Sequence, residues 1–378
     1  MTRPLEGVLV IAVEQAVAAP FCTARLADAG ARVIKIERKE GDFARFYDDS
    51  APGSSSYFVW LNRGKQSLVL DLAQPEERSK LEALIAHADI MVQNLKPGAM
   101  SRMGLAIEDM RKKYPRLICC SISGYGDTGP LANRKAYDLL VQAESGLASI
   151  TGGPTEPARV GISIVDIATG ATAHAAILEA LIARGITGDG ADIRISMFDV
   201  MADWLTVPLL NTEAGKPPQR MGLAHPSIAP YGVFETADLR RILISIQSER
   251  EWKAFCATVL DKPALANDPK FCTNVIRVRN RAEIDAAVGR IFETLNGASL
   301  IARLTEADIA FAELNDMEAL SKHPHLLRIE VATEAGPVRF PAPGAIVLGP
   351  PRQYGPVPGI GEQTDTILSE FCGETVLK

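Results

Sequence analysis

Apolar and polar residues alternate along the first two hundred residues in a way that predicts alternating strands and helices. Short β-branched runs have the length of buried strands, and longer stretches with helical spacing lie between them. Strands are predicted over 8–13, 33–37, 67–72, 90–93 and 116–122, and helices over 20–29, 75–88 and 107–113. Nearly continuous apolar strands that alternate with helices are typical of a parallel sheet covered on both faces. We therefore expect an α/β fold with a Rossmann-like parallel sheet in a large domain.

The pattern changes after about Val207. Residues 211–230 are rich in Gly, Pro and polar side chains, as in a linker. They precede two short predicted strands, 231–236 and 241–247, and helices predicted over 249–260, 281–295 and 299–307. These elements indicate a smaller α+β domain. The expected division is therefore a large domain of 1–207 and 325–378, and a linker with the small domain over 208–324.

The C-terminal tail differs in composition from the rest of the chain. From Pro337 the chain is rich in Pro and Gly and is predicted to be extended, including 349–351 and 355–358. A helix is predicted over 364–371. An extended tail without its own core must lie on another surface, which is either the large domain or a partner subunit.

One aspartate stands out where a buried strand is expected to meet a long helix. Residues 159–165 are rich in β-branched side chains and predict a strand, and the Ala-rich stretch from Ala168 predicts a helix. Asp166 would then lie exposed at the carboxyl edge of the sheet, where ligands bind in α/β proteins. A carboxylate there can act as a nucleophile or a base. Asp is also a preferred N-cap residue whose charge suits the positive end of a helix, and position alone favours this cap.

Composition is that of an ordinary soluble globular protein. The 378 residues suffice for two domains, with 47% hydrophobic and 23% charged side chains. The net charge of −6 gives no electrostatic case for a nucleic-acid partner. The first residues have no signal-peptide pattern, and the most apolar run, about 171–183, is interrupted by polar residues and too short to cross a bilayer. We expect a cytoplasmic protein without a membrane partner.

Several common sites are disfavoured by the sequence. The six cysteines and five histidines show neither metal nor disulfide spacing, so we expect reduced cysteines and no metal. Cys119 and Cys120 are neighbours in a predicted strand and should point to opposite faces. The first predicted strand is not followed by Gly-x-Gly-x-x-Gly, which argues against a nicotinamide dinucleotide site. Neither a P-loop nor a Gly-x-Ser-x-Gly motif is present.

A series of short segments along almost the whole chain occurs in one order. The segments are 5–7, 19–20, 33–38, 62–67, 93–98, 123–130, 135–138, 145–146, 151–152, the Asp166 segment 159–170, and 361–364. Together they resemble the class III CoA-transferases, the formyl-CoA transferase-like family that also contains carnitine and bile-acid CoA-transferases. The resemblance implies CoA and acyl-CoA as substrates rather than a permanently bound cofactor.

The resemblance also implies roles for two carboxylates. Family members carry their nucleophilic aspartate at the position of Asp166, which attacks an acyl-CoA thioester and then carries CoA as an aspartyl thioester. In this context the nucleophile becomes the favoured reading of Asp166, and it is compatible with a helix N-terminus that keeps the carboxylate ionised. Asp138 is expected either to orient the reacting groups or to cap a helix over 139–147.

A CoA-binding surface follows from the matched positions. Candidates for the CoA phosphates are basic residues, each of which could equally be a solvated surface charge: Arg38, Lys96, Arg102 and Lys135. Other candidates are the main-chain N–H groups of Val17 and Ala18, together with Leu70, Leu72, Asn94, Leu95, Tyr125 and Tyr137. Formyl-CoA transferases carry Gln where this chain has Val17, and they have a Gly-rich loop that is not found here. Both differences argue against formyl or oxalyl specificity.

An unusual loop opens the predicted small domain. Residues 222–231 place His225, Ser227 and Tyr231 among apolar residues and prolines. Dicarboxylate-using members of the family carry a similar Ala-His-x-Ser-Ile-x-Pro-Tyr run. We expect these side chains to bind the distal carboxylate of the acceptor acid, with a structural turn fixed by prolines as the alternative.

Three other readings remain open. An α-methylacyl-CoA racemase shares the fold but needs His where this chain has Tyr137, and a tyrosine with a pKa of about 10 is a poor base at neutral pH. A non-catalytic CoA-binding protein would not need both Asp166 and Asp138. An intramolecular transferase would use the same residues.

The family architecture also implies a homodimer of two open rings threaded through each other, with 208–229 and the tail as long connections.

Overall fold

The computed structural model describes residues 3–345 and 352–373, so the predicted extended segment 349–351 lies outside the described residues. Its large sheet has the order β3-β2-β1-β4-β5-β6 with every neighbouring pair parallel. The strands are Leu9–Val13 (β1), Arg32–Glu37 (β2), Lys65–Val69 (β3), Ile90–Gln93 (β4), Ile118–Ser123 (β5) and Asp192–Ser196 (β6). This order is that of the doubly wound dinucleotide-binding sheet, and it confirms the α/β prediction. The strand order reverses between β1 and β4, because β2 and β3 are added on one side of β1 and β4 to β6 on the other. In such sheets ligands bind in the crevice at the carboxyl ends of the strands at this point.

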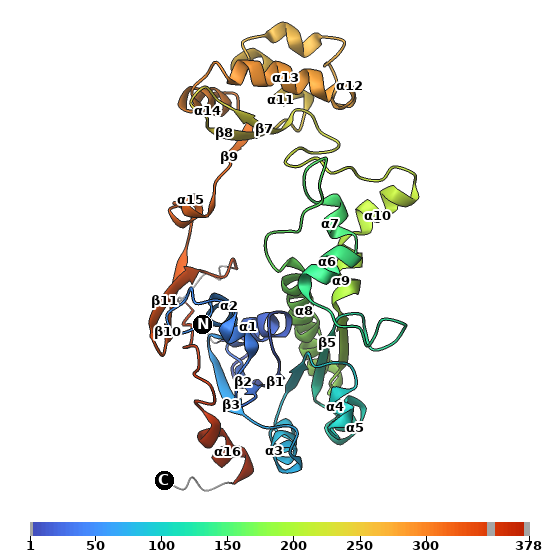
Figure 1. Ribbon diagram of the computed structural model, residues 1–378, viewed down its shortest axis with the longest axis vertical. Helices are drawn as coiled ribbons and strands as arrows, with labels where there is room; N and C mark the ends of the chain where they lie inside the picture. The colour runs from blue at the N-terminus through green and yellow to red at the C-terminus, as the bar shows by residue number, and fades with distance from the viewer. Residues whose placement is uncertain (1–2, 346–351, 374–378) are drawn as a thin grey trace. The chain divides into compact units, whose positions relative to one another are not determined.

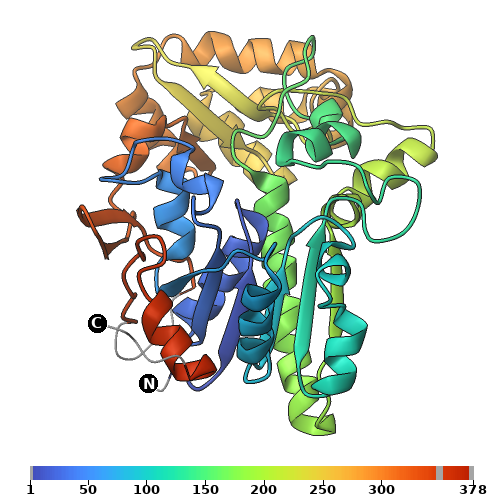
Figure 2. The same ribbon diagram turned by 60° about the horizontal axis from the view of Figure 1, so that its bottom comes forward.

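Helices cover both faces of this sheet (Figures 1 and 2). Those at its faces and ends are Ala18–Asp28 (α1), Ser56–Asn62 (α2), Pro75–Ile85 (α3), Ala99–Arg102 (α4), Ile107–Lys113 (α5), Asp138–Glu144 (α6), Ile164–Thr187 (α8), Met197–Trp204 (α9) and Thr364–Cys372 (α16). Helices α1, α3 and α5 occur within two residues of where the hydrophobic pattern predicts a helix to begin. Helices α2 and α9 were not predicted, because their sequences are too short to show a clear period.

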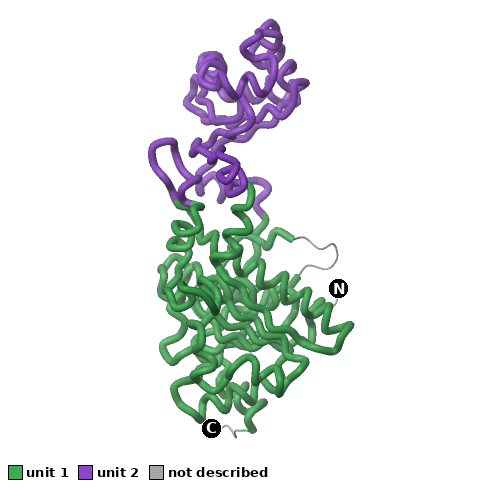
Figure 3. Tube along the Cα trace, turned by 90° about the vertical axis from the view of Figure 1, so that its right-hand side faces the viewer, with its two compact units in different colours: residues 1–147, 159–207, 327–378 green, residues 148–158, 208–326 purple. Residues whose placement is uncertain are grey.

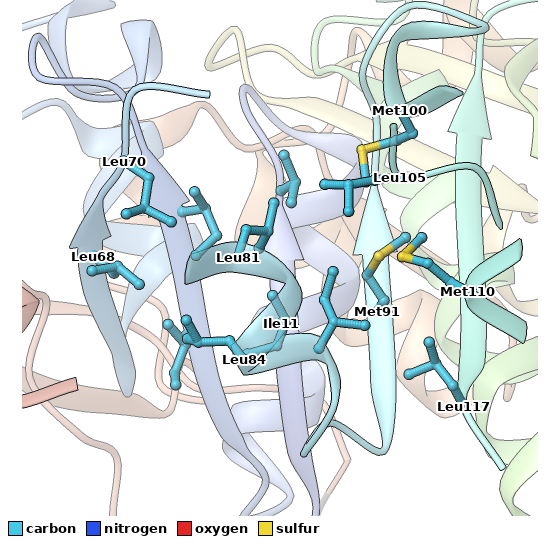
Figure 4. Packing of buried hydrophobic residues seen from close by; sticks show 14 of the residues in the cluster. Ile11, Leu68, Leu70, Leu81, Leu84, Met91, Met100, Leu105, Met110 and Leu117 are labelled. Atoms are coloured by element: carbon cyan, nitrogen blue, oxygen red, sulfur yellow. The ribbon is translucent and has the colours of Figure 1, made fainter. Parts of the chain in front are cut away.

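Successive residues of each strand enter opposite cores. Ile11 and Met91 pack with Leu81 and Leu84 of α3 and with Met110 of α5 in one buried cluster, shown in Figure 4. On the other face, strand residues pack against the buried sides of α1 and α8, namely Val10, Ala12, Val33, Val92 and Ile118 against Ala19, Cys22, Leu26, Ala173 and Ile177. Cys119 belongs to the first cluster and Cys120 to the second, which confirms that the two side chains point to opposite faces.

The prediction of a strand over 159–165 is wrong. Residues 160–163 are irregular, and α8 begins at Ile164 with Ser163 as its N-cap. A β-branched run forms a strand only where a sheet edge is open to it, and the outer edge of β5 is occupied by β6. Strand β6 escaped prediction because its alternation of charged and apolar residues, Asp192 to Ser196, marks a half-exposed edge strand.

Helix α8 packs closely against α1 and extends beyond the apolar run recognised in the sequence. A Cβ added at Gly170 would lie 2.4 Å from the carbonyl oxygen of Ala18, so only glycine allows this approach of the two helices. The helix has 24 residues and is long and apolar enough to cross a membrane. Length and composition alone are weak evidence for a membrane span, and this helix supplies Ala173, Ile177 and Ala180 to the buried core.

By its internal contacts the chain divides into two compact units, 1–147 with 159–207 and 327–378, and 148–158 with 208–326 (Figure 3). The short helices Leu147–Ile150 (α7) and Thr206–Glu213 (α10) straddle the division. The domain boundaries at 207 and 324 stay a prediction.

The second unit is built on a small antiparallel sheet with the order β7-β8-β9. Its strands are Tyr231–Glu235 (β7), Arg241–Ser245 (β8) and Ala310–Glu313 (β9), and its helices are Glu249–Ala254 (α11), Asn274–Arg279 (α12), Arg281–Phe292 (α13), Gly297–Glu306 (α14) and Met317–Ser321 (α15). Trp252, Phe255 and Phe292 lie at the centre of its buried core. The two predicted strands and the helices α11, α13 and α14 are confirmed.

The tail of the chain lies on the first unit. It contains a hairpin of Arg328–Thr333 (β10) and Gly336–Pro341 (β11) before the extended segment that leads to α16. The Gln363 amide oxygen accepts a hydrogen bond from the Ser67 N–H at 2.7 Å, and the Thr364 hydroxyl accepts one from the Val69 N–H at 3.1 Å. These bonds cover the outer edge of β3. Of the two surfaces expected for the tail, the structure therefore uses the chain's own sheet.

Candidate functional site

A cavity of about 510 Å³ opens at the carboxyl ends of β1, β4 and β5, next to the first turn of α8. It brings together residues that the sequence analysis proposed from separate motifs. These lining residues are Val17, Ala18, Asn94, Leu95, Lys96, Lys135, Tyr137, Asp138 and Asp166. The two candidate carboxylates thus share one cavity at the switch point of the sheet, where doubly wound proteins bind their ligands.

Asp166 is the third residue of α8 and is partly buried in this cavity. Burial raises the pKa of its carboxyl group to about 7, and the negative charge of Asp138 adds to the rise. The structure therefore corrects the expectation of an exposed carboxylate kept fully ionised by the helix: Asp166 is partly buried, and its raised pKa leaves it partly ionised at neutral pH. The positive end of a helix favours a carboxylate by only about 0.3–1 kcal/mol, which is less than the desolvation of a buried charge costs.

Asp138 holds the start of α8. One of its oxygens, Oδ2, accepts hydrogen bonds from the Val165 N–H at 2.8 Å and the Asp166 N–H at 3.2 Å. The other, Oδ1, accepts a bond from Nε2 of Gln142 at 2.6 Å. Asp138 is itself the first residue of α6, whose N-cap position is Tyr137. Its carboxylate therefore caps a helix, as one reading expected, but the helix is α8 and not its own.

Aromatic side chains that the sequence analysis missed form another wall of the cavity. Phe43, Tyr47 and Tyr57 line it, and the Tyr57 hydroxyl lies 3.3 Å from Oγ of Ser163, the N-cap residue of α8. Burial raises the pKa of Tyr47 to about 12, so its hydroxyl stays protonated. The available signal was compositional: five aromatic residues fall within 43–58 in a chain with 6% aromatic residues.

A second cavity of about 580 Å³ lies at the carboxyl ends of β1 to β4. It gathers the predicted Arg38, Leu70, Leu72, Leu95, Lys96 and Arg102. It also contains Arg78, which the sequence analysis missed. Helix α3 is amphipathic, and a charged side chain on such a helix is ordinarily expected to lie in solvent. The Arg78 guanidinium donates to the carbonyl oxygens of Leu72 and Ala73, which turns it back over the ends of the strands. Gln15, Leu95 and Lys96 line both cavities, so the two cavities are neighbours.

Four proposed residues lie elsewhere. Tyr125 lines neither cavity; its ring contacts Phe198, and the Arg134 guanidinium lies 5.8 Å from its centroid. His225, Ser227 and Tyr231 belong to the second unit. There the rings of His225 and Tyr231 stack at 5.3 Å, and the Ser227 N–H donates to Nδ1 of His225 at 3.1 Å. A neutral His225 therefore carries its proton on Nε2, which makes that nitrogen a donor.

Within residues 3–345 and 352–373, no group of three or more His, Cys, Asp or Glu side chains is placed to hold a metal ion. What the first unit offers instead is a partly buried carboxylate with a raised pKa, two helix N-termini at one cavity, and a neighbouring cavity with four cations in its lining. Four carboxylates also line that second cavity, and three of them, Glu14, Glu37 and Asp42, are paired with cations. This arrangement suits a nucleophilic carboxylate and a long phosphorylated substrate.

Comparison with known proteins shows the family of the chain. The chain matches the model of CoA-transferase family III over residues 5–364. It is 36% identical over 375 residues to an acetyl-CoA:oxalate CoA-transferase of Acetobacter aceti, covering 98% of this chain and 96% of that protein. It is 34% identical over 381 residues to the succinyl-CoA:glutarate CoA-transferase of Homo sapiens, covering 97% and 86%.

A solved structure extends the likeness to the fold. A CAIB/BAIF family protein from Brucella suis has 32% sequence identity and a TM-score of 0.85, covering 97% of this chain and 99% of that one. The sequence likeness and the structural likeness both span nearly the whole chain. The chain therefore belongs to CoA-transferase family III and is a CoA-transferase.

Proposed function

We propose that this enzyme moves CoA from an acyl-CoA to a free dicarboxylic acid and that Asp166 is its nucleophile. The observation that carries the proposal is the pair of neighbouring cavities that share three lining residues. Asp166 lies in one, and the basic residues lie in the other, at the far side of Gln15, Leu95 and Lys96. CoA has a phosphorylated end and a thioester end, so a substrate that spans both cavities would bring its thioester to Asp166.

The proposed reaction has four steps in which no water is consumed. An oxygen of the Asp166 carboxylate attacks the thioester carbonyl, the C–S bond breaks, and a mixed anhydride and the CoA thiolate result. The thiolate attacks the aspartyl carbonyl of the anhydride, releasing the donor acid as a carboxylate and leaving an aspartyl-CoA thioester. The acceptor carboxylate then attacks this thioester and expels the thiolate. Finally the thiolate attacks the acceptor carbonyl, giving acceptor-CoA and the free Asp166 carboxylate.

The surroundings of Asp166 support the first of these steps. Its pKa of about 7 gives a sizeable ionised fraction at neutral pH and a carboxylate more nucleophilic than one of ordinary pKa. Val17 and Ala18 lie at the start of α1, where the first N–H groups of a helix have no acceptor within it. We propose that these N–H groups bind the oxyanion that forms at the attacked carbonyl.

The cations of the second cavity are proposed to bind the CoA phosphates. Replacing Arg38 or Arg102 by alanine should raise the KM for acyl-CoA about 10-fold, since a hydrogen bond to a charged group contributes about 1.5–3 kcal/mol and exposed positions give the lower part of that range. The kcat should change less than 3-fold. Steady-state kinetics would measure both. Lys112→Ala on α5 is the control, because Lys112 is exposed and lines neither cavity. An unchanged KM in both arginine variants would contradict this assignment.

The acceptor is proposed to be a dicarboxylate of the succinate, itaconate, mesaconate or malate type. Two relatives are named for oxalate and glutarate, and a third, 32% identical, is a succinyl-CoA:mesaconate CoA-transferase of Haloarcula hispanica. His225, with Nε2 as a donor, suits the distal carboxylate of such an acid. A His225→Ala variant should then lose transfer to dicarboxylates about 10-fold or more. Transfer to monocarboxylates should stay as it was, and equal activity of the variant on both acids would contradict the role.

A homodimer is part of the proposal. Large apolar side chains of α8 to α10 are exposed, among them Ile186 (83%), Trp204 (56%) and Val207 (68%). Such a run of exposed apolar side chains suits burial against a second copy of the chain. Sedimentation equilibrium would measure the oligomeric state. The cytoplasmic location stays a prediction.

The test of the proposed function is direct trapping of the intermediate. The protein is mixed with candidate acyl-CoAs in the absence of acceptor, quenched with hydroxylamine or borohydride, and digested for mass spectrometry. A modification on the peptide that contains Asp166, seen with only some of the acyl-CoAs, would identify the nucleophile and the donor together. Full transfer activity with no modification of this peptide would refute the mechanism.

A further inference from the structure

A turn of unusual geometry forms the edge of the active cavity. It follows β1 and consists of Glu14, Gln15, Ala16 and Val17, of which the last three line the cavity that contains Asp166. Ala16 has a φ of +63°, a conformation that costs a residue with a Cβ about 1–2 kcal/mol. Such a conformation persists only when the surrounding structure holds it.

The turn is held by side chains from three other segments. Asn94, after β4, donates from Nδ2 to the Gln15 carbonyl oxygen at 2.8 Å and accepts from the Gln15 N–H at 3.0 Å. Lys35 of β2 donates from Nζ to the Glu14 carbonyl oxygen at 3.3 Å. Asp42 accepts a bond from the Ala16 N–H at 3.2 Å through Oδ1. Four consecutive polar groups of the main chain, from the Glu14 carbonyl to the Ala16 N–H, are therefore fixed by side chains.

Asp42 and Lys35 belong to a buried network of ion pairs beneath the turn. Asp42 Oδ2 lies 2.8 Å from Lys35 Nζ, and both side chains are at most 1% exposed. Glu14 pairs with Lys65 at 2.6 Å, and Glu37 with Arg45 at 2.6 Å. The network balances three carboxylates, Glu14, Glu37 and Asp42, against three cations, Lys35, Lys65 and Arg45.

Stability alone does not account for this network. Buried ion pairs are costly to desolvate, and apolar residues of the same volume commonly give equal or greater stability. What ion pairs provide is a fixed position, and here the position fixed is that of Ala16. The next residues, Val17 and Ala18, line the cavity at the start of α1, and their main-chain N–H groups are the ones proposed to bind the oxyanion.

We infer that Asp42, clamped by Lys35, and Asn94 are positioning residues that hold the strained turn at Ala16, and through it the N–H groups of Val17 and Ala18, in place for reaction at Asp166. This inference rests on the proposed function. Asn94 lines the cavity of Asp166 and Asp42 lines its neighbour, but the role inferred for both is to hold the turn and not to contact the reacting atoms. Their effect is on the placement of donors, for which a displacement of about 1 Å can cost 10²-fold in rate.

The test compares two buried carboxylates, each of which pairs with a buried cation. Asp42→Asn keeps the size of the side chain but has only one oxygen, so it cannot accept from both Lys35 and the Ala16 N–H. The control is Asp28→Asn. Asp28 is 4% exposed in its side chain and accepts from Nε of the buried Arg63 at 2.9 Å, yet neither residue lines either cavity. For both variants the kcat of CoA transfer, the KM for acyl-CoA and the melting temperature are measured.

We expect both variants to lose a similar amount of melting temperature, and only Asp42→Asn to lose about 10- to 100-fold in kcat with KM changed less than 3-fold. Asn94→Ala, which truncates a partly exposed side chain, should show the same loss of kcat and provides the test if Asp42→Asn does not fold. An unchanged kcat in the variants of the turn, or an equal loss in Asp28→Asn, would overturn the inference. Trapping on the native protein separates these outcomes from failure of the proposed mechanism, because it reports on Asp166 independently.

Discussion

Asp166→Ala is expected to abolish CoA transfer, with a loss of kcat of at least about 10⁴-fold, as is usual when a covalent nucleophile is removed. No covalent modification should form on any acyl-CoA. The reason is that every step of the proposed reaction passes through the Asp166 carboxylate, and the alanine side chain offers no group that could carry an acyl or CoA moiety. Radiolabelled CoA exchange and mass spectrometry of the quenched protein would measure the two effects.

The chain contains a closely matched control. Asp199 is the third residue of α9, whose N-cap residue Ser196 accepts from the Asp199 N–H, just as Asp166 is the third residue of α8. Each aspartate contributes about 0.3–1 kcal/mol to its helix through the helix dipole. Asp199→Ala should therefore keep full activity, and an Asp166→Ala variant that still transfers CoA would refute the mechanism.

The same carboxylate should carry a stability signature. Its folded-state pKa of about 7 lies above the unfolded value of 3.8, so the folded protein binds the extra proton between these pH values. This contribution to the free energy of unfolding is complete below about pH 4 and is lost as the pH rises through 7. Asp166→Asn should therefore melt at a higher temperature than the native protein at pH 8 and not at pH 4.

Asp138→Asn is expected to move the pH dependence of the first step to lower pH. The negative charge of Asp138 helps to raise the pKa of Asp166, so removing it lets that pKa fall below about 7. The rate of anhydride formation, which requires ionised Asp166, should then reach half of its maximum at a lower pH than in the native protein. Single-turnover kinetics between pH 5 and pH 9 would measure the midpoint.

The maximal rate of this variant should fall about 10-fold or more. An asparagine has one acceptor oxygen, which cannot serve Gln142 Nε2 as well as the N–H groups of Val165 and Asp166. Asp138→Ala removes both the negative charge and every hydrogen bond of this carboxylate, whereas Asp138→Asn keeps one acceptor oxygen. The alanine variant leaves the N–H groups without an acceptor and should cost about 1–3 kcal/mol of stability. A midpoint that stays at its native pH in both variants would show that Asp138 has no electrostatic effect on Asp166.

The sheet could be predicted from the sequence because its strands are buried on both faces. β1, β2, β4 and β5 consist almost entirely of apolar or β-branched residues, and each was expected within two residues of its bounds. The failure at residues 159–165 has the opposite cause. Val160 and Ile162 have the composition of a strand but find no free sheet edge, because β6 pairs with β5 in that place.

The candidate site shows the same division. Arg38, Asn94 and Asp166 lie at the ends of separate elements, and short motifs around them resemble one family, which was enough to single them out. The sequence analysis missed Tyr47, Arg78 and Asp42. Nothing in their local sequence distinguishes a tyrosine in the wall of a cavity, an arginine that folds back over the strand ends, or a buried aspartate that holds a turn from ordinary residues of the same types. Only their neighbours in space make that distinction.

The sequence by itself determined the family and the parallel sheet and singled out Asp166 as the candidate nucleophile, because hydrophobic period and short motifs are local properties of a chain. The tertiary structure alone decided how that aspartate behaves. Desolvation and the charge of Asp138 depend on distances between segments, and together they raise the pKa of Asp166 to about 7 where the sequence predicted an ordinary, ionised carboxylate.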